Sequence, residues 1–268
     1  MNIFEKMNDR ILFCGQGAGV MAIECDTGIF QAFEESGIIP GKALTSSGST
    51  LFSSLYYSGH PVRWFHDLME NRSLDEFFQF SIGGTIGSLF GGARHIVNND
   101  GVKELLERYM TAKATLRVTT SVTKLSDWSA KFMSATPLTA LAATSIPWVF
   151  KPVKIGDSLY VDGGVVNNIP LPKPEELDKW DHIYVFLAPK TVYNDKECDP
   201  LLIGLIELLQ AIMDRELKQL EETGYFDNPK ITVINPPDAL GGGLLNWSPN
   251  FQLRDAVYKQ TKELLQNA

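Results

Sequence analysis

Cysteine and histidine are scarce in this sequence, and their spacing is unlike that of metal-binding proteins. The three cysteines, Cys14, Cys25 and Cys198, are odd in number and include no C-x-x-C pair. This usage is typical of reduced thiols in a cytosolic protein rather than of a disulfide framework. No two of the four histidines are spaced as a metal-binding pair either. Both absences argue against a structural metal site.

Long apolar runs are also missing. The first ten residues contain no apolar segment of the kind found in signal peptides. The most apolar helical stretch, residues 201–213, is too short to span a bilayer and contains Glu207. We therefore expect a cytoplasmic protein that is soluble, or at most peripheral on membranes.

The sequence has no excess of basic residues. Its 32 acidic residues outnumber 24 basic ones, for a formal charge of -8 and a pI near 5.1. This balance argues against nucleic-acid binding and against adsorption to anionic lipid through charge alone. Hydrophobic residues at 44% and charged residues at 21% are ordinary for a globular protein. With no repeat or convincing linker, we predict a single domain over residues 1–268.

Segments with strand and helix patterns alternate along the chain. The predicted strands cover residues 10–14, 42–45, 115–122, 158–162, 182–187 and 230–234. The predicted helices cover residues 28–37, 49–57, 61–80, 101–110, 137–144, 201–222 and 251–266, and residues 81–92 are expected to form a loop. This alternation predicts an α/β fold, a three-layer α/β/α sandwich around a largely parallel sheet.

A glycine-rich turn, Gly15-Gln-Gly-Ala-Gly19, follows the first predicted strand. Glycines there allow backbone N–H groups to face a pocket, an arrangement that suits a phosphate or an oxyanion. The dinucleotide fingerprint G-x-G-x-x-G fails because Val20 stands where its third glycine should be. The alternative is an ordinary tight turn between a strand and a helix.

Two further turns follow predicted strands, where ligands bind in open α/β sheets. Thr45-Ser-Ser47-Gly-Ser49 has the layout of a G-x-S-x-G nucleophile elbow with Ser47 at its centre, although both flanking glycines are replaced. Its alternative is a serine-rich helix cap. Asp162-Gly163-Gly164 ends another strand, and its alternative is a simple Asp-Gly turn.

The order of the histidines bears on the choice of a base for Ser47. In the usual α/β hydrolase the histidine comes last, after the acid. Only His182 follows Asp162, and it opens a predicted buried strand. If Ser47 is a nucleophile, its base is therefore not expected to be a histidine.

The three turns together resemble the motifs of the patatin-like phospholipase family. That family has a glycine-rich oxyanion loop, a G-x-S-x-G elbow and a D-G-G/A motif that carries the acid of a Ser-Asp dyad. The most specific likeness runs from Ala142-Ala-Thr-Ser-Ile-Pro147 to Tyr160-Val-Asp162-Gly-Gly-Val-Val-Asn-Asn168-Ile-Pro170. The motifs occur in the family's order, and the resemblance covers most of the chain from Ile11 onward.

The resemblance implies a lipid acyl hydrolase of the phospholipase A type that needs no cofactor. Ser47 would be the nucleophile and Asp162 the base. The oxyanion hole would be formed by backbone N–H groups in the glycine turn and the elbow: Gly15, Gln16, Gly17, Ala18, Gly19 and Gly48. Two departures stand out, the lost elbow glycines and the absence of the family's usual Arg or Lys in the glycine turn.

The implied partners are a phospholipid or other fatty-acyl ester and, transiently, a membrane surface. Residues 77–90 and 240–247 mix apolar residues with glycines and could form a lipid-facing rim, or could be ordinary loops. Three rival functions stay open. They are an esterase or thioesterase acting on another acyl substrate, a non-catalytic binding module of the same fold, and a nucleotide-binding protein.

Overall fold

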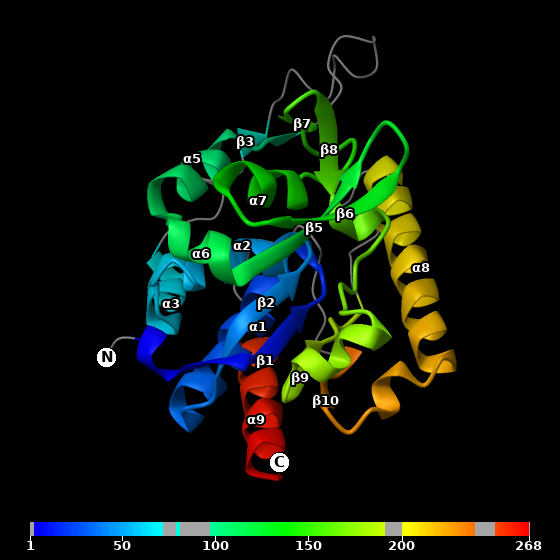
Figure 1. The fold of residues 1–268 in the computed structure, drawn as a ribbon. Helices are drawn as coiled ribbons and strands as arrows, with labels where there is room; N and C mark the ends of the chain where they lie inside the picture. The colour runs from blue at the N-terminus through cyan, green and yellow to red at the C-terminus, as the bar shows by residue number, and fades with distance from the viewer. Residues whose placement is uncertain (1–2, 72–78, 81–96, 191–199, 239–249, 268) are drawn as a thin grey trace, which may run out of the picture.

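The computed structural model describes residues 3–71, 79–80, 97–190, 200–238 and 250–267, and a mixed sheet runs through its centre (Figure 1). The strands of this sheet are β1 Met7–Gly15, β2 Ile39–Thr45, β5 Val118–Lys124, β6 Ser129–Ser134, β7 Val153–Ile155, β8 Ser158–Asp162, β9 His182–Phe186 and β10 Ile231–Ile234. Their order is β10-β9-β1-β2-β5-β8-β7, with β6 beside β5. A separate short pair joins β3 Gln79–Phe80 to β4 Val97–Asn98.

Parallel pairing brings the carboxyl ends of five strands to one edge of the sheet. The pairs β10–β9, β9–β1, β1–β2 and β2–β5 are all parallel, and Gly15 lies opposite both Thr45 and Phe186. Strand β5 continues past Thr120, which lies opposite Thr45 at the end of β2. The antiparallel strand β8 ends with Asp162 opposite Val122, just beyond that level. The turns after β1, β2 and β8 therefore lie close together at this edge.

Helices cover both faces of the sheet. They are α1 Gly19–Ser36, α2 Ser47–Tyr56, α3 Val62–Asn71, α5 Asp100–Tyr109, α6 Ala112–Arg117, α7 Pro137–Ala143, α8 Pro200–Glu222 and α9 Phe251–Asn267, with short 3₁₀ segments at Ile3–Lys6, Gly163–Val165, Pro174–Lys179 and Tyr225–Asp227. Ile11 and Phe13 of β1 face the core shared with α1, α2 and α9, whereas Leu12 and Cys14 face a second core that includes side chains of α8. The predicted α/β fold with a mostly parallel sheet is confirmed.

Aromatic rings fill the larger core and fix α1 and α2 against the sheet. The ring of Phe13 lies 4.9 Å from that of Phe30 in α1, and the Phe30 ring lies 5.1 Å from that of Phe52 in α2. All three side chains are fully buried. Burial of each contributes on the order of 2 kcal/mol, so the two helices whose first residues face the sheet edge are firmly placed.

Several local expectations are wrong. Helix α1 begins at Gly19, nine residues before the predicted start. Residues 115–117 belong to helix α6 rather than to a strand, and strands β6 and β7 were not predicted. Of the helix predicted at 61–80, residues 62–71 form α3, but residues 79–80 form strand β3 rather than helix. The predicted loop at 81–92 lies outside the described residues. Within the described parts of the chain, no helix is both long and apolar enough to cross a bilayer.

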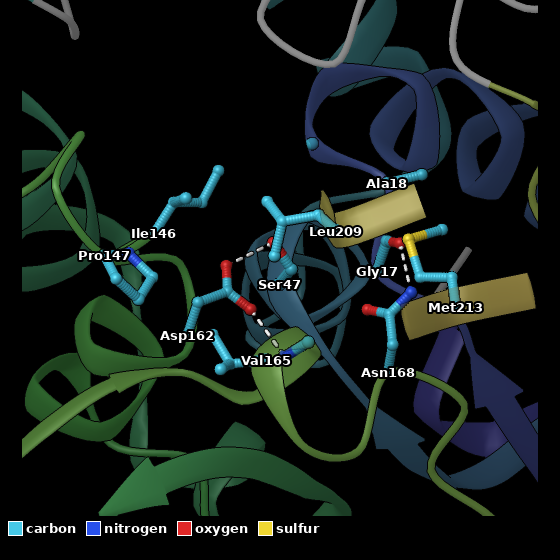
Figure 2. A pocket seen from close by; sticks show the side chains of 12 residues that line it. Gly17, Ala18, Ser47, Ile146, Pro147, Asp162, Val165, Asn168, Leu209 and Met213 are labelled. Atoms are coloured by element: carbon cyan, nitrogen blue, oxygen red, sulfur yellow. Dashed lines mark hydrogen bonds between the residues drawn. The ribbon is translucent and has the colours of Figure 1, made fainter. Parts of the chain in front are cut away.

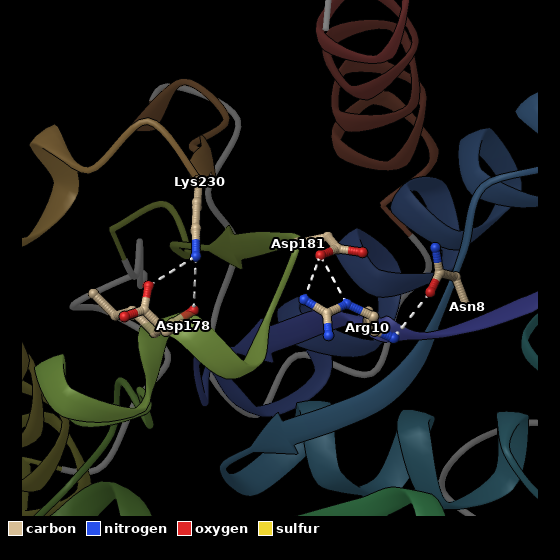
Figure 3. A network of polar contacts seen from close by, with 6 residues as sticks. Asn8, Arg10, Asp178, Asp181 and Lys230 are labelled. Atoms are coloured by element: carbon tan, nitrogen blue, oxygen red, sulfur yellow. Dashed lines mark hydrogen bonds and ion pairs between the residues drawn. The ribbon is translucent and has the colours of Figure 1, made fainter.

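Two charged pairs lie at the other end of the parallel strands, near where β9 and β10 begin (Figure 3). The guanidinium of Arg10 in β1 donates from Nε to Asp181 Oδ1 at 2.8 Å, just before β9. Lys230, just before β10, places its Nζ 3.1 Å from Asp178 Oδ1. The Arg10 guanidinium lowers the pKa of the Asp181 carboxyl. These pairs are largely exposed and contribute little stability.

Candidate active site

Ser47 occupies a strained turn between β2 and α2. Its φ is 47°, in the left-handed region that a residue with a side chain rarely adopts. Ser46 before it is extended, and α2 starts at Ser47 itself, so the chain reverses direction at this residue. A strained strand-to-helix turn of this kind presents the nucleophilic serine in α/β hydrolases. Among the serines at 46, 47 and 49, Ser47 is the one with a positive φ at this turn.

The replaced elbow glycines are accommodated by neighbouring residues. A Cβ added to Gly15 in β1 would lie 2.7 Å from Ser49 Oγ, so the missing side chain of Gly15 provides the room that Ser49 occupies. Ser49 Oγ donates to the Gln16 carbonyl at 3.1 Å. Thr45 is buried, and its hydroxyl lies 3.0 Å from that of Thr50. Gly48 remains essential, because a Cβ there would overlap the Gly19 carbonyl oxygen.

The hydroxyl of Ser47 and the carboxylate of Asp162 form a direct hydrogen bond (Figure 2). Ser47 Oγ donates to Asp162 Oδ2 at 2.6 Å, and the Gly164 N–H donates to Oδ1 at 2.8 Å. The Asp162 backbone N–H donates to the Ser145 carbonyl at 2.9 Å, which fixes the end of β8. Each carboxylate oxygen therefore has its own donor, and the carboxylate is oriented toward Ser47.

Burial changes the acid strength of Asp162. The side chain is almost inaccessible to solvent, and this desolvation raises the pKa of its carboxyl to about 7. The hydrogen bonds from Ser47 and Gly164 act in the opposite direction and only partly offset it. A carboxylate with a pKa near neutrality is a far stronger base than an exposed one, and this is what proton transfer from a serine requires.

The glycine turn contributes fewer free backbone donors than the sequence predicted. The N–H of Gln16 donates to the Phe186 carbonyl at 3.2 Å, and the N–H of Gly17 donates to the Asn168 carbonyl at 3.2 Å. Gly15 belongs to β1, and neither it nor Gln16 lines the pocket around Ser47. Of the predicted donors at this turn, Ala18 and Gly19 line the hollow and take part in neither of these bonds.

Ala18 and Gly19 lie at the start of α1, where backbone N–H groups have no partner within the helix. Ala18 occupies the N-cap position and has no side-chain oxygen to cap these donors. Helix α2 likewise begins beside the pocket, with Gly48 in its first turn. The positive ends of two helix dipoles thus meet next to Ser47, which favours negative charge there.

A small hollow opens beside the Ser47–Asp162 pair. Figure 2 shows the side chains around it. Its apolar walls come from three parts of the chain: Ile146 and Pro147 after α7, Val165 after β8, and Leu209 and Met213 in α8. Such a wall suits a hydrocarbon chain. The two α8 residues were not predicted, although Leu209 and Met213 follow the four-residue spacing of one helix face.

The described histidines have structural environments away from this hollow. The ring of His60 lies 4.4 Å from the ring of Trp64, and His182 Nε2 lies 2.9 Å from the Thr232 hydroxyl. His66 is partly buried on α3, where desolvation lowers the pKa of its ring. Among the described residues, no group of His, Cys, Asp and Glu is arranged to hold a metal ion.

Several predicted features lie outside the described residues. They are His95, Cys198 and the two candidate lipid-facing segments at 77–90 and 240–247, of which only Gln79 and Phe80 are described, as strand β3. Cys14 and Cys25 are described as free buried thiols, and burial raises the pKa of both. Neither lines the hollow beside Ser47.

Comparison with known proteins agrees with this architecture. The crystal structure of VipD from Legionella pneumophila is similar, with a TM-score of 0.53 and 13% sequence identity over 96% of this chain. The chain spans 66% of that protein's chain, and at such identity the likeness concerns the fold alone. No curated protein matches the sequence. The model of the family described as patatin-like phospholipase matches residues 19–173, more than half of the chain and a span that contains both Ser47 and Asp162. The chain belongs to the patatin-like phospholipase family.

Proposed function

We propose that this protein hydrolyses fatty-acyl esters of lipids, with Ser47 as nucleophile and Asp162 as base. The observation that supports this most directly is the 2.6 Å hydrogen bond from Ser47 Oγ to Asp162 Oδ2. The strained elbow and the apolar hollow add to it, and membership of the family supports lipid acyl hydrolysis in general.

In the first half of the reaction, Ser47 Oγ attacks the ester carbonyl carbon while its proton moves to Asp162 Oδ2. The carbonyl oxygen becomes an oxyanion, for which the candidate donors are the N–H groups of Ala18 and Gly19, which line the hollow, and that of Gly48, which follows Ser47 in the first turn of α2. One such donor contributes ~3 kcal/mol to the stability of the transition state. Collapse of the tetrahedral intermediate breaks the ester C–O bond, and Asp162 returns the proton to the departing alcohol.

In the second half, water hydrolyses the acyl-Ser47 ester. Asp162 accepts a proton from the water as its oxygen attacks the acyl carbon, and the same donors stabilise the second oxyanion. The proton then returns to Ser47 Oγ as the fatty acid leaves. Each step uses side chains and backbone groups of this chain, with the Gly164 N–H keeping Asp162 in place throughout.

The substrate is proposed to enter from a lipid surface. Three exposed apolar side chains each neighbour a residue that lines the hollow: Trp148 beside Pro147, Val166 beside Val165 and Leu208 beside Leu209. We call Trp148, Val166 and Leu208 the apolar collar. A collar of this kind can contact the acyl region of a membrane while the hollow accepts one chain.

An acyl-hydrolase assay on phospholipid vesicles and on p-nitrophenyl esters tests the proposal. We expect Ser47→Ala and Asp162→Asn to lose nearly all activity. Ser46→Ala is the matched control, because the Ser46 hydroxyl is buried without a hydrogen-bond partner among the described residues. Only the parent and this control should be labelled by a serine-reactive fluorophosphonate at Ser47. Hydrolysis by Ser47→Ala at the parent rate would refute the assignment, and activity on thioesters alone would favour a thioesterase.

A further inference from the structure

We propose that Glu216 of helix α8 is a positioning residue, which holds the glycine turn in its reactive shape through Asn168. This inference rests on the proposed function, since it concerns the donors that would stabilise the oxyanion. Glu216 neither lines the hollow nor touches Ser47 or Asp162. Its link to the site runs through two pairs of hydrogen bonds.

The first pair joins Asn168 to the glycine turn. The Gly17 N–H donates to the Asn168 carbonyl at 3.2 Å, and Asn168 Nδ2 donates to the Gly17 carbonyl at 2.9 Å. Figure 2 shows the second of these bonds beside the hollow. A Cβ on Gly17 would lie 2.5 Å from Asn168 Oδ1, so the two residues are in close contact. The position of Asn168 therefore sets the position of Gly17, and with it the adjoining N–H groups of Ala18 and Gly19.

The second pair holds Asn168 itself. Asn168 lies outside the helices and strands, between two 3₁₀ segments, so no ladder of backbone bonds fixes it. The N–H groups of Asn168 and Ile169 donate to Glu216 Oε2 and Oε1 at 2.8 Å and 3.2 Å. Each oxygen of the carboxylate is thus used by one of two consecutive backbone amides. Hydrogen bonds to a charged acceptor are roughly twice as strong as neutral ones.

The Glu216 carboxylate is partly buried and bonds to backbone amides rather than to a basic side chain. Burial raises the pKa of its carboxyl, and the amides of Asn168 and Ile169 are the groups that counteract this. No lysine or arginine of the described chain forms an ion pair with it. Desolvation of a carboxylate has a cost, and among the described residues the two backbone bonds are the groups that offset it.

Helix α8 also forms part of the hollow. Leu209 and Met213 line it, and Glu216 follows Met213 by three residues, so all three lie along one face of the helix. That face provides both the apolar wall for an acyl chain and the carboxylate that holds the glycine turn. An acyl chain packed against Leu209 and Met213 would therefore press on the element that positions the oxyanion donors.

The test is Glu216→Gln in the full chain, with Glu221→Gln as the matched control. Glu221 lies on the same helix and is exposed, so both variants remove one negative charge from α8. A glutamine side chain accepts through one oxygen only and loses one of the two backbone bonds. We expect kcat on a p-nitrophenyl ester to fall roughly tenfold or more, with KM changed by less than about twofold. Phosphonylation of Ser47 should slow in parallel, because its product also places an oxygen in the oxyanion hole.

A double-mutant cycle with Asn168→Ser separates positioning from general stability. Asn168→Ser removes the side-chain bond to the Gly17 carbonyl but keeps the backbone groups that bond to Glu216 and to the Gly17 N–H. If Glu216 acts through Asn168, the losses in kcat from the two substitutions should therefore be less than additive. Should Glu216→Gln fail to fold by thermal melting, Glu216→Asp takes its place, since it keeps the charge but shortens the reach. Additive losses, or a kcat equal to that of Glu221→Gln, would overturn the role of Glu216. An inactive parent with unlabelled Ser47 would instead refute the proposed function, and this inference with it.

Discussion

At the scale of single residues, the Asp162 carboxyl makes the reactivity of Ser47 depend on pH. Its pKa is raised to about 7 by burial, and only the ionised form can accept the Ser47 proton. We therefore expect kcat/KM to rise with pH and to level off above about 7, since this parameter reports the free enzyme. A pH profile with a soluble ester checks this. A profile that is already flat from pH 5 upward would contradict it.

The same shift makes Asp162 costly for stability. Because the pKa rises from 3.8 to about 7 on folding, the folded state keeps a proton that the unfolded state has released across this window. The stability that Asp162 provides at low pH is therefore lost as pH increases toward 7. Asp162→Asn avoids this loss, so above neutral pH it should be more stable than the parent by up to ~4 kcal/mol. Urea unfolding of both proteins at low and high pH measures the difference, which should vanish in acid.

Gly48 and Ser49 are adjacent, yet they should respond in opposite ways to substitution. In Gly48→Ala the new Cβ would overlap the Gly19 carbonyl oxygen, a backbone atom that cannot move without displacing α1. We expect loss of fluorophosphonate labelling and a destabilisation of ~1–3 kcal/mol. Ser49→Gly restores the family's residue and gives up one hydrogen bond to Gln16, so activity should persist with a loss of about 1 kcal/mol. Equal labelling of the two variants would argue against the packing of α1 on the elbow.

At this scale, motif spacing was enough to identify Ser47 and Asp162 as the pair that lies together. It could not show that Gly15 accommodates Ser49, because that contact depends on how β1 packs beside α2. Nor could it reveal that Phe186 and Asn168 already accept the N–H groups of Gln16 and Gly17. Those acceptors are about 150 residues away in sequence or more, and backbone acceptors carry no side-chain signature.

At the scale of elements, the missed half of α1 shows where pattern reading fails. Glu24 and Asp26 are buried in this helix, although their residue types predict an exposed surface. The Asn250 N–H donates to Glu24 Oε1 at 3.2 Å, so the burial of Glu24 involves the residue just before α9, far away in sequence. By contrast, the end of α1 was predictable, because Gly37 adopts the left-handed C-cap conformation that favours glycine.

The contact between α1 and α9 can be tested with two glycines in helices. A Cβ on Gly28 in α1 would lie 2.5 Å from the Arg254 carbonyl oxygen in α9, whereas Gly204 in α8 has open space. Alanine is preferred to glycine inside a helix by about 1 kcal/mol. We therefore expect Gly204→Ala to raise the melting temperature. Gly28→Ala should lower it, because displacement of α9 outweighs that preference, and both variants should keep their activity. A higher melting temperature for Gly28→Ala would mean that the helices separate easily.

At the scale of the whole molecule, net charge and exposed apolar side chains have different effects on contact with a lipid surface. The formal charge of -8 gives no attraction to anionic headgroups, so any approach to a lipid surface must depend on apolar contact. Each residue of the apolar collar is adjacent in sequence to a residue that lines the hollow, and Trp148 is 63% exposed and Leu208 53% exposed. The sequence offered residues 77–90 and 240–247 as a possible rim, and apart from residues 79–80 these segments lie outside the described residues. The collar residues come from three other segments, after α7, after β8 and in α8.

If apolar contact rather than charge brings the protein to lipid, its binding to vesicles should depend on the apolar collar and not on salt. Because burial of one leucine side chain contributes ~1.5–3 kcal/mol, Leu208→Ser should weaken co-sedimentation with zwitterionic vesicles roughly tenfold. Leu116→Ser is the matched control, since Leu116 is 75% exposed but lies on α6, which precedes the amino end of β5. Binding of the parent should change little between low and high salt, because salt screens charge and not apolar contact. Equal losses in the two variants, or release of the parent by salt, would place the contact elsewhere. A larger loss of vesicle binding in Leu208→Ser than in Leu116→Ser would indicate that the lipid contacts the side of the molecule on which the hollow opens.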